Sequence, residues 1–60
     1  MFNDKELKYL EEIINEEIKD YLDSGYPLTD DYVVTLREIL KKLGVQEIYR
    51  FSEYEVDNND

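Results

Sequence analysis

Apolar side chains between Leu28 and Val45 recur every three or four residues, the spacing of one face of an α-helix. They are Tyr32, Val33, Leu36, Ile39, Leu40 and Leu43. This pattern predicts a helix over about residues 30–43. Thr29 is the expected N-cap, because its hydroxyl can accept a hydrogen bond from a free amide of the first turn. Gly44 can adopt the left-handed conformation that ends a helix.

A second amphipathic pattern precedes the first and predicts a helix over about residues 4–24. Its apolar stripe consists of Leu7, Leu10, Ile14, Ile18 and Tyr21. Asn3 is the expected N-cap, and Glu6 stands three residues later, which is the spacing of a capping box. Gly25 is the expected stop, and Tyr26 can then fold back against the end of the helix.

The connection between the two predicted helices, residues 23–28, is short. Pro27 prevents early helix re-entry, because the residue before a proline is biased away from helical conformation. Helices joined by so short a link lie antiparallel. The fold class is therefore mainly α, an antiparallel two-helix hairpin. The expected interior consists of Leu7, Leu10, Ile14, Ile18, Tyr21, Leu36, Ile39, Leu40 and Leu43.

The segment after the hairpin, residues 45–56, is rich in β-branched and aromatic residues and fits neither period cleanly. A short third helix is one interpretation, but no Ser, Thr, Asp or Asn between Gly44 and Ile48 is available to cap it. We therefore expect an extended strand over about 47–51. A lone strand needs a partner strand from a second copy or another protein. Residues 57–60 are polar and are expected to fray.

The length of 60 residues predicts a single small domain, 1–60, with little core to stabilise it. Domains of this size usually gain stability from disulfides, metals or oligomerisation. Cysteine and histidine are both absent, so disulfides and the commonest transition-metal ligands are excluded. Oligomerisation remains, and we expect a homodimer that completes the core.

The net charge of −9 is unevenly distributed. Residues 1–20 and 45–60 each carry a net −4, whereas 21–44 carry −1. This balance argues against direct binding to nucleic acid or to an anionic membrane, and favours a basic protein partner. Four carboxylates at helical spacing form the candidate partner-binding stripe of the first helix: Glu12, Glu16, Asp20 and Asp23. The alternative interpretation is an acidic surface that only confers solubility.

Two further residues of the first helix, Tyr9 and Ile13, lie off its apolar stripe. They could cover the edge of the core or pack under the C-terminal segment. The alternative is a second contact surface for another chain, and both residues are therefore included among the candidate partner-binding residues.

Catalytic and cofactor chemistry finds little support in the sequence. No histidine is present to activate Ser24, Ser52, Thr29 or Thr35 as a nucleophile. The acidic tail lacks the glycine and terminal glutamate of an EF-hand loop. We therefore expect neither an enzyme nor a bound metal or cofactor.

Targeting signals are also not apparent. No apolar run reaches the roughly 20 residues that span a bilayer, and no basic stretch followed by an apolar one marks a signal peptide. The expected location is the cytoplasm.

The two successive stretches ELKYLEEIINEEIKDYLDSG and YPLTDDYVVTLREILKKLG resemble small acidic helical-hairpin proteins of Gram-positive bacteria and their phages. The likeness lies in composition and helix punctuation and covers about two thirds of the chain. It implies a phage-encoded accessory protein that binds and inhibits a basic host protein, such as a nuclease, and acts in the host cytoplasm. Some inhibitors of this type resemble DNA in charge distribution. The sequence thus predicts a non-catalytic protein-binding module; the alternative is a self-associating structural module with no dedicated target.

Overall fold

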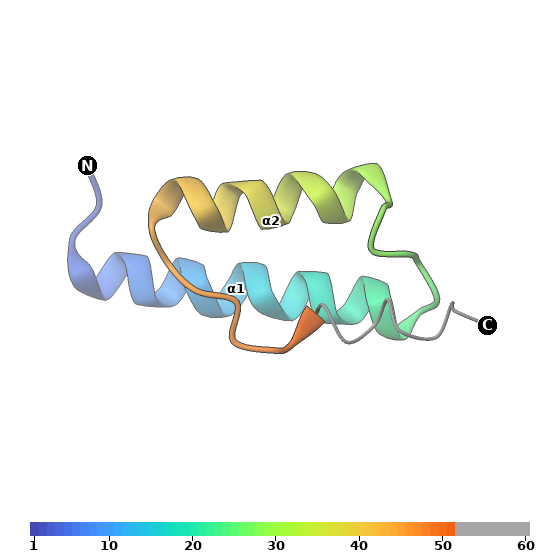
Figure 1. Cartoon of the computed structure of the whole chain (residues 1–60). Coiled ribbons are helices and arrows are strands. Elements are labelled where there is room, and N and C mark those ends of the chain that lie inside the picture. The colour runs from blue at the N-terminus through green and yellow to red at the C-terminus, as the bar shows by residue number, and fades with distance from the viewer. Residues whose placement is uncertain (52–60) are drawn as a thin grey trace.

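The computed structural model describes residues 1–51, which form two packed helices followed by a segment that returns along them (Figure 1). Helix α1 spans Asp4–Asp23 and helix α2 spans Asp31–Leu43. The helices lie side by side and run in opposite directions. The predicted mainly helical, two-helix architecture is confirmed. Residues 52–60, which include the last five residues of the predicted C-terminal segment and the whole tail, lie outside the described residues.

The signals that begin and end α1 act as predicted. The Asn3 side chain accepts a hydrogen bond from the Glu6 amide at 2.8 Å, and the Glu6 carboxylate accepts one from the Asn3 amide at 3.0 Å. Gly25 has a positive φ of 102°, a conformation that costs glycine little. The Tyr26 amide then donates to the Tyr21 carbonyl at 3.1 Å, which turns the chain back over the end of α1.

Helix α2 begins one residue later than predicted. Asp30, and not Thr29, is the N-cap: its carboxylate accepts from the amides of Tyr32 at 3.0 Å and Val33 at 3.4 Å. A charged carboxylate is a stronger acceptor than a hydroxyl and also interacts favourably with the positive end of the helix dipole. The predicted stop at Gly44 is confirmed, with a positive φ of 79°.

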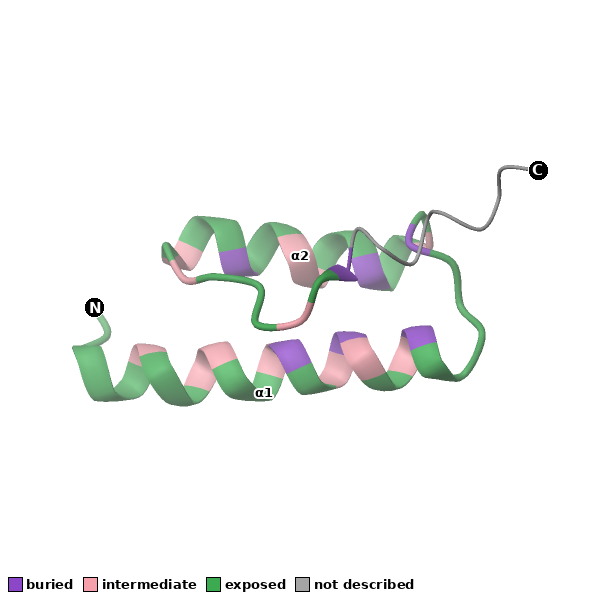
Figure 2. Cartoon of the chain, turned by 60° about the horizontal axis from the view of Figure 1, so that its bottom comes forward, coloured by how far each residue is buried: buried purple, intermediate pink, exposed green. Residues whose placement is uncertain are grey.

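The buried core lies between the two helices and under the returning segment (Figure 2). It contains six apolar side chains: Ile18, Leu22, Leu28, Val33, Leu40 and Phe51. The predicted interior is therefore only partly correct, because Ile18 and Leu40 are buried while most other predicted members are half-buried. The prediction for Ile39 is wrong, since this side chain is 38% exposed.

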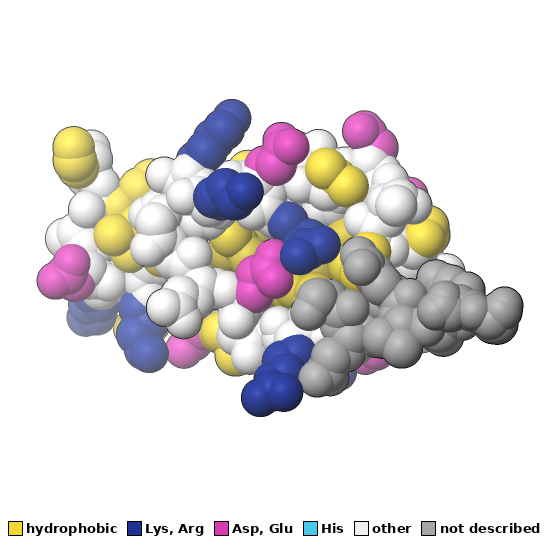
Figure 3. Space-filling model, viewed as in Figure 1, with side chains coloured by type: hydrophobic (Ala, Val, Ile, Leu, Met, Phe, Trp, Pro, Cys, Tyr) yellow, Lys and Arg dark blue, Asp and Glu magenta, His cyan; other side chains and the backbone are white. Residues whose placement is uncertain are grey.

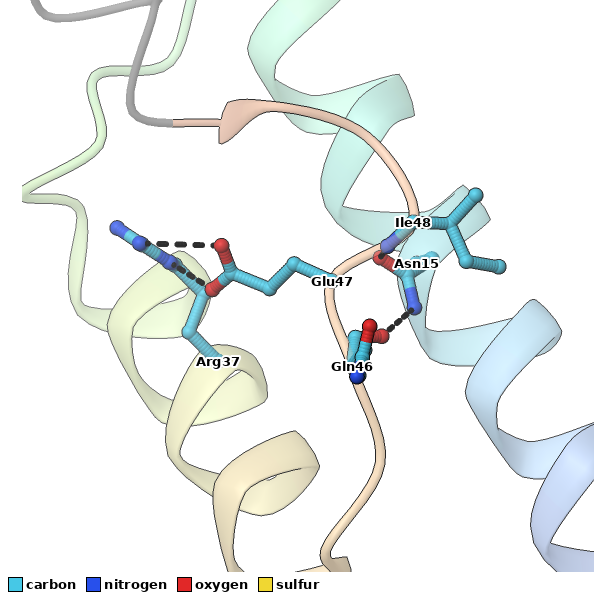
Figure 4. A network of polar contacts seen from close by, with 5 residues as sticks. All are labelled: Asn15, Arg37, Gln46, Glu47 and Ile48. Carbon is cyan, nitrogen blue, oxygen red and sulfur yellow. Dashed lines mark hydrogen bonds and ion pairs between the residues drawn. The ribbon is translucent and has the colours of Figure 1, made fainter.

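The predicted strand over 47–51 is also wrong, because residues 45–50 are irregular and no strand occurs within residues 1–51. The physical reason is the side chain of Asn15, which is fully buried on α1. Its amide nitrogen donates to the Gln46 carbonyl at 3.0 Å, and its amide oxygen accepts from the Ile48 amide at 2.8 Å (Figure 4). The Asn15 side chain thus provides a hydrogen-bond partner for one carbonyl and one amide of the segment, the role that a neighbouring strand would otherwise have.

Two further contacts hold this segment against both helices. The Glu11 carboxylate accepts from the Gln46 amide at 3.2 Å, one helical turn before Asn15. From the other helix, the Arg37 guanidinium pairs with the Glu47 carboxylate at 2.7 Å (Figure 4). The segment therefore covers one side of the hairpin and brings Phe51 into the core.

The corrected core makes a prediction about two adjacent residues of α2. Leu40→Ala should lower the free energy of unfolding by about 2–5 kcal/mol, because it leaves a cavity at a side chain that is only 1% exposed. Ile39→Ala removes a similar volume from a position that is partly exposed in the monomer, and it should cost the monomer less than about 1 kcal/mol. Urea unfolding followed by circular dichroism measures both, and equal losses for the two variants would contradict the core described here.

The contacts of Asn15 make a second prediction. Asn15→Leu leaves the Gln46 carbonyl and the Ile48 amide without their partner, and it should cost about 1–3 kcal/mol because both hydrogen bonds are partly buried. The control is Gln46→Ala, because the Gln46 side chain is exposed and only its backbone takes part. Chemical unfolding curves of the two variants should therefore diverge; an Asn15→Leu variant as stable as the control would show that the segment is held by other contacts.

Candidate protein-binding surface

The six candidate partner-binding residues lie on the side of α1 that faces away from α2, which we call the outer face. It consists of Tyr9, Glu12, Ile13, Glu16, Asp20 and Asp23, and every one of these residues is exposed. Residues three or four apart are neighbours on a helix surface, so the two apolar side chains lie among the carboxylates. The structure therefore places the candidates on one surface.

The four carboxylates of the outer face do not form a uniform free row. Glu16 accepts a hydrogen bond from the Tyr49 hydroxyl, and Asp23 forms an ion pair with Lys19 at 2.9 Å. The side chains of Glu12 and Asp20 make no hydrogen bond or ion pair with another residue of the described part, 1–51. These two carboxylates are consequently the best placed to meet an external cation.

The two apolar residues of the outer face, Tyr9 and Ile13, are both largely exposed. Tyr9 is 55% exposed and Ile13 is 63% exposed, and they stand one helical turn apart. Neither belongs to the core cluster, and neither is covered by the C-terminal segment as far as Phe51. The two side chains therefore do not cover the core in the described part of the chain, and a contact with another chain stays a prediction.

The side of the hairpin covered by the C-terminal segment has a different character. On this side acidic and basic side chains are interspersed over both helices (Figure 3). The Lys19 ammonium lies 5.5 Å from the centre of the Tyr49 ring, a distance at which a cation is attracted to an aromatic face. A basic partner would therefore find less continuous negative charge here than on the outer face.

A tyrosine cluster at the connection between the helices was not predicted as a unit. The Tyr21 ring lies 4.6 Å from both the Tyr26 ring and the Tyr32 ring. The Tyr32 hydroxyl donates to the Glu17 carboxylate at 2.9 Å, which joins α2 to α1. Helical spacing could suggest that these rings share one side, but their mutual contact depends on the packing of the two helices.

Comparison with protein-family models, with curated proteins and with solved structures gives no match to this chain. The surface itself is therefore the guide to function. Within residues 1–51 no three His, Cys, Asp or Glu side chains gather where they could hold a metal ion. Neither α1 nor α2 has the length and apolar composition that a membrane-spanning helix needs.

The hydrogen bonds of Tyr32 and Tyr49 to carboxylates of α1 lead us to expect a loss of stability at alkaline pH. Hydrogen bonding to Glu17 raises the pKa of Tyr32 above its ordinary value of 10.0, and hydrogen bonding to Glu16 raises the pKa of Tyr49 likewise. Burial adds to both shifts. A pKa that is higher in the folded chain stabilises the fold below pH 10 and ceases to do so as the pH rises through the folded value.

Thermal unfolding at increasing pH should therefore show a melting temperature that falls above about pH 10. The fall should be smaller in the double variant Tyr32→Phe/Tyr49→Phe, which has no phenol at either position. Tyr9→Phe is the control, because the Tyr9 hydroxyl makes no hydrogen bond within the described residues. An unchanged alkaline fall in the double variant would contradict the role of these two bonds.

Proposed function

We propose that this chain is a non-catalytic protein-binding module whose outer face engages a basic protein. The observation that carries the proposal is the exposure of Tyr9 and Ile13 on the same face as Glu12 and Asp20. Apolar side chains surrounded by charged ones are typical of a protein–protein contact, in which the apolar pair is desolvated and the charges form the rim.

The partner favoured by this face carries positive charge around an apolar patch. The chain has 16 acidic and 7 basic side chains, so it attracts a basic protein over a distance of about one Debye length, ~8 Å at physiological ionic strength. Such attraction speeds association more than it raises affinity. The resemblance to phage proteins implies an inhibitor of a nuclease or another nucleic-acid-binding protein. Such an inhibitor would act by occupying the basic surface that normally binds the nucleic acid.

The outer face carries fewer charges per unit length than a strand of DNA. Glu12 and Asp23 are eleven residues apart, so the four carboxylates extend over about 16 Å of helix. One strand of DNA carries a charge every ~3.4 Å, which is a denser row. The proposed contact is therefore a mixed apolar and acidic one, in which Tyr9 and Ile13 contribute as much to recognition as the charges.

The second candidate function is self-association without a dedicated target. The observation that favours it is the half-buried apolar side of the hairpin opposite the C-terminal segment, which includes Leu36 and Leu43. This surface is separate from most of the outer face, and the two functions can therefore be tested independently.

The proposed function is tested by charge reversal at the two free carboxylates. Glu12→Lys/Asp20→Lys should release any protein that the parent chain captures from host lysate, because both changes bring positive charge to the contact. The matched control is Asp31→Lys/Glu38→Lys, which makes the same change in net charge at two exposed positions of α2. We expect the control to retain the captured protein.

Two outcomes would contradict the acidic contact. One is equal loss of the captured protein from both variants, which would indicate only a dependence on net charge. The other is capture that survives the Glu12→Lys/Asp20→Lys change and high salt. Circular dichroism of each variant should first show the helical content of the parent, because the four positions lie outside the core.

A further inference from the structure

The side of the hairpin opposite the C-terminal segment, which we call the open face, is apolar and only partly covered. It consists of Leu10, Ile14, Tyr21, Tyr32, Leu36, Ile39 and Leu43. The two sides differ in burial: Asn15, under the C-terminal segment, is fully buried, whereas its neighbour Ile14 is only half-buried. Seven apolar side chains from two adjacent helices thus form one surface that the described part of the chain does not cover.

The charge of the open face indicates what can cover it. Glu17 lies between its apolar members on α1, and its carboxylate already accepts the Tyr32 hydroxyl; Lys42 lies beside Leu43 at one end. Elsewhere the net charge of −9 makes two copies of the chain repel each other. On the open face a second copy meets a mostly apolar surface with little charge, and a strongly basic partner would find little to bind.

The size of the open face is compatible with a small interface. The 13 residues of α2 extend over about 20 Å, and two helices side by side measure about 20 Å across, so the flat footprint is about 400 Å². The accessible area of a corrugated helix surface exceeds its footprint, and interfaces smaller than about 600 Å² per partner are typical of weak association. We therefore expect association in the micromolar range, ~8 kcal/mol or less.

We infer that two copies pair through their open faces in a symmetric dimer whose two-fold axis runs parallel to the helices. This axis places α1 of one protomer against α2 of its partner, and the four helices form one antiparallel bundle. Helix α1 carries eight acidic and three basic side chains, a net −5, whereas α2 carries two acidic and three basic, a net +1. The other face-to-face arrangement, α1 against α1, would bring together two helices of −5 each.

The arrangement fixes which residues of the two copies meet. The contact between Tyr21 and Tyr32 places these residues at the same level of the antiparallel hairpin, and the same alignment puts Ile39 level with Ile14. An axis parallel to the helices keeps each level unchanged between the copies. The exposed Ile13 of one protomer should therefore lie at the rim of the interface, beside the partner's Ile39.

The dimer interface and the proposed contact with a basic protein share Ile13 at their border, whereas Glu12 and Asp20 lie outside the open face. Glu12→Lys/Asp20→Lys should therefore leave dimerisation intact. The proposed contact with a basic partner can fail while the dimer stands, and the reverse also holds.

The first experiment measures the oligomeric state by sedimentation from about 1 µM to about 1 mM, the range in which such an interface dissociates. Ile39→Glu should weaken dimerisation at least tenfold, because it buries a charge at the interface. Val34→Glu is the matched control: Val34 is 37% exposed, against 38% for Ile39, but lies on the opposite flank of α2. A parent chain that stays monomeric throughout, or two variants with equal effects, would overturn the inference.

The second experiment tests the arrangement directly and does not depend on a destabilising variant. The chain has no cysteine, so single cysteines can be introduced at chosen positions. An equimolar mixture of Ile13→Cys and Ile39→Cys chains should form the disulfide between the two different chains, since a disulfide needs Cα atoms within about 7 Å. Predominant disulfide formation between two Ile13→Cys chains would show α1 against α1 and overturn the arrangement.

Discussion

The path of the segment after α2 depends on a single buried amide. Asn15 lies on the inner side of α1 among apolar residues, where an unpaired polar group would cost a few kcal/mol. Its nitrogen donates to the carbonyls of Glu11 and Gln46, and its oxygen accepts from the amide of Ile48. Each hydrogen-bonding group of the side chain therefore has a partner, and the irregular segment after α2 has a place to bind.

The consequences of this contact reach most of the molecule. The helices and their connection supply five of the six buried apolar side chains, and the returning segment supplies the sixth, Phe51. The segment also makes the hairpin asymmetric: one side is closed by residues 45–51, and the other is left as an apolar surface. The outer face is connected to the same segment through the hydrogen bond between Tyr49 and Glu16. The packing that stabilises the monomer thus also determines which surfaces remain for partners.

The helices and their ends could be predicted because their signals are local. The capping box of Asn3 and Glu6 and the stops at Gly25 and Gly44 each act within a few residues. The burial of individual side chains was less predictable: a helical stripe indicates which side is apolar, but it does not show where a third segment will lie. Ile39 and Leu40 are adjacent in one such stripe and differ in burial for this reason.

The role of Asn15 could not be predicted, because asparagine in a helix normally faces solvent. Its partners, Gln46 and Ile48, are more than 30 residues away, and they are backbone groups that leave no trace in the sequence. The strand was expected over 47–51 because this contact is not visible in the sequence. The residue types favour extended backbone, and the backbone of the segment does need hydrogen-bond partners. A side chain meets that need within the chain. The outer-face residues, by contrast, could be identified from helical spacing alone.

The measurement that tests this account most directly is amide hydrogen exchange at Ile48 in the intact chain. This amide belongs to no helix or strand, and its hydrogen-bond acceptor is the Asn15 side chain at 2.8 Å. The account predicts exchange much slower than in an unstructured peptide, with protection comparable to that of the central amides of α1. Exchange of the Ile48 amide at the unstructured rate, while the α1 amides stay protected, would contradict it.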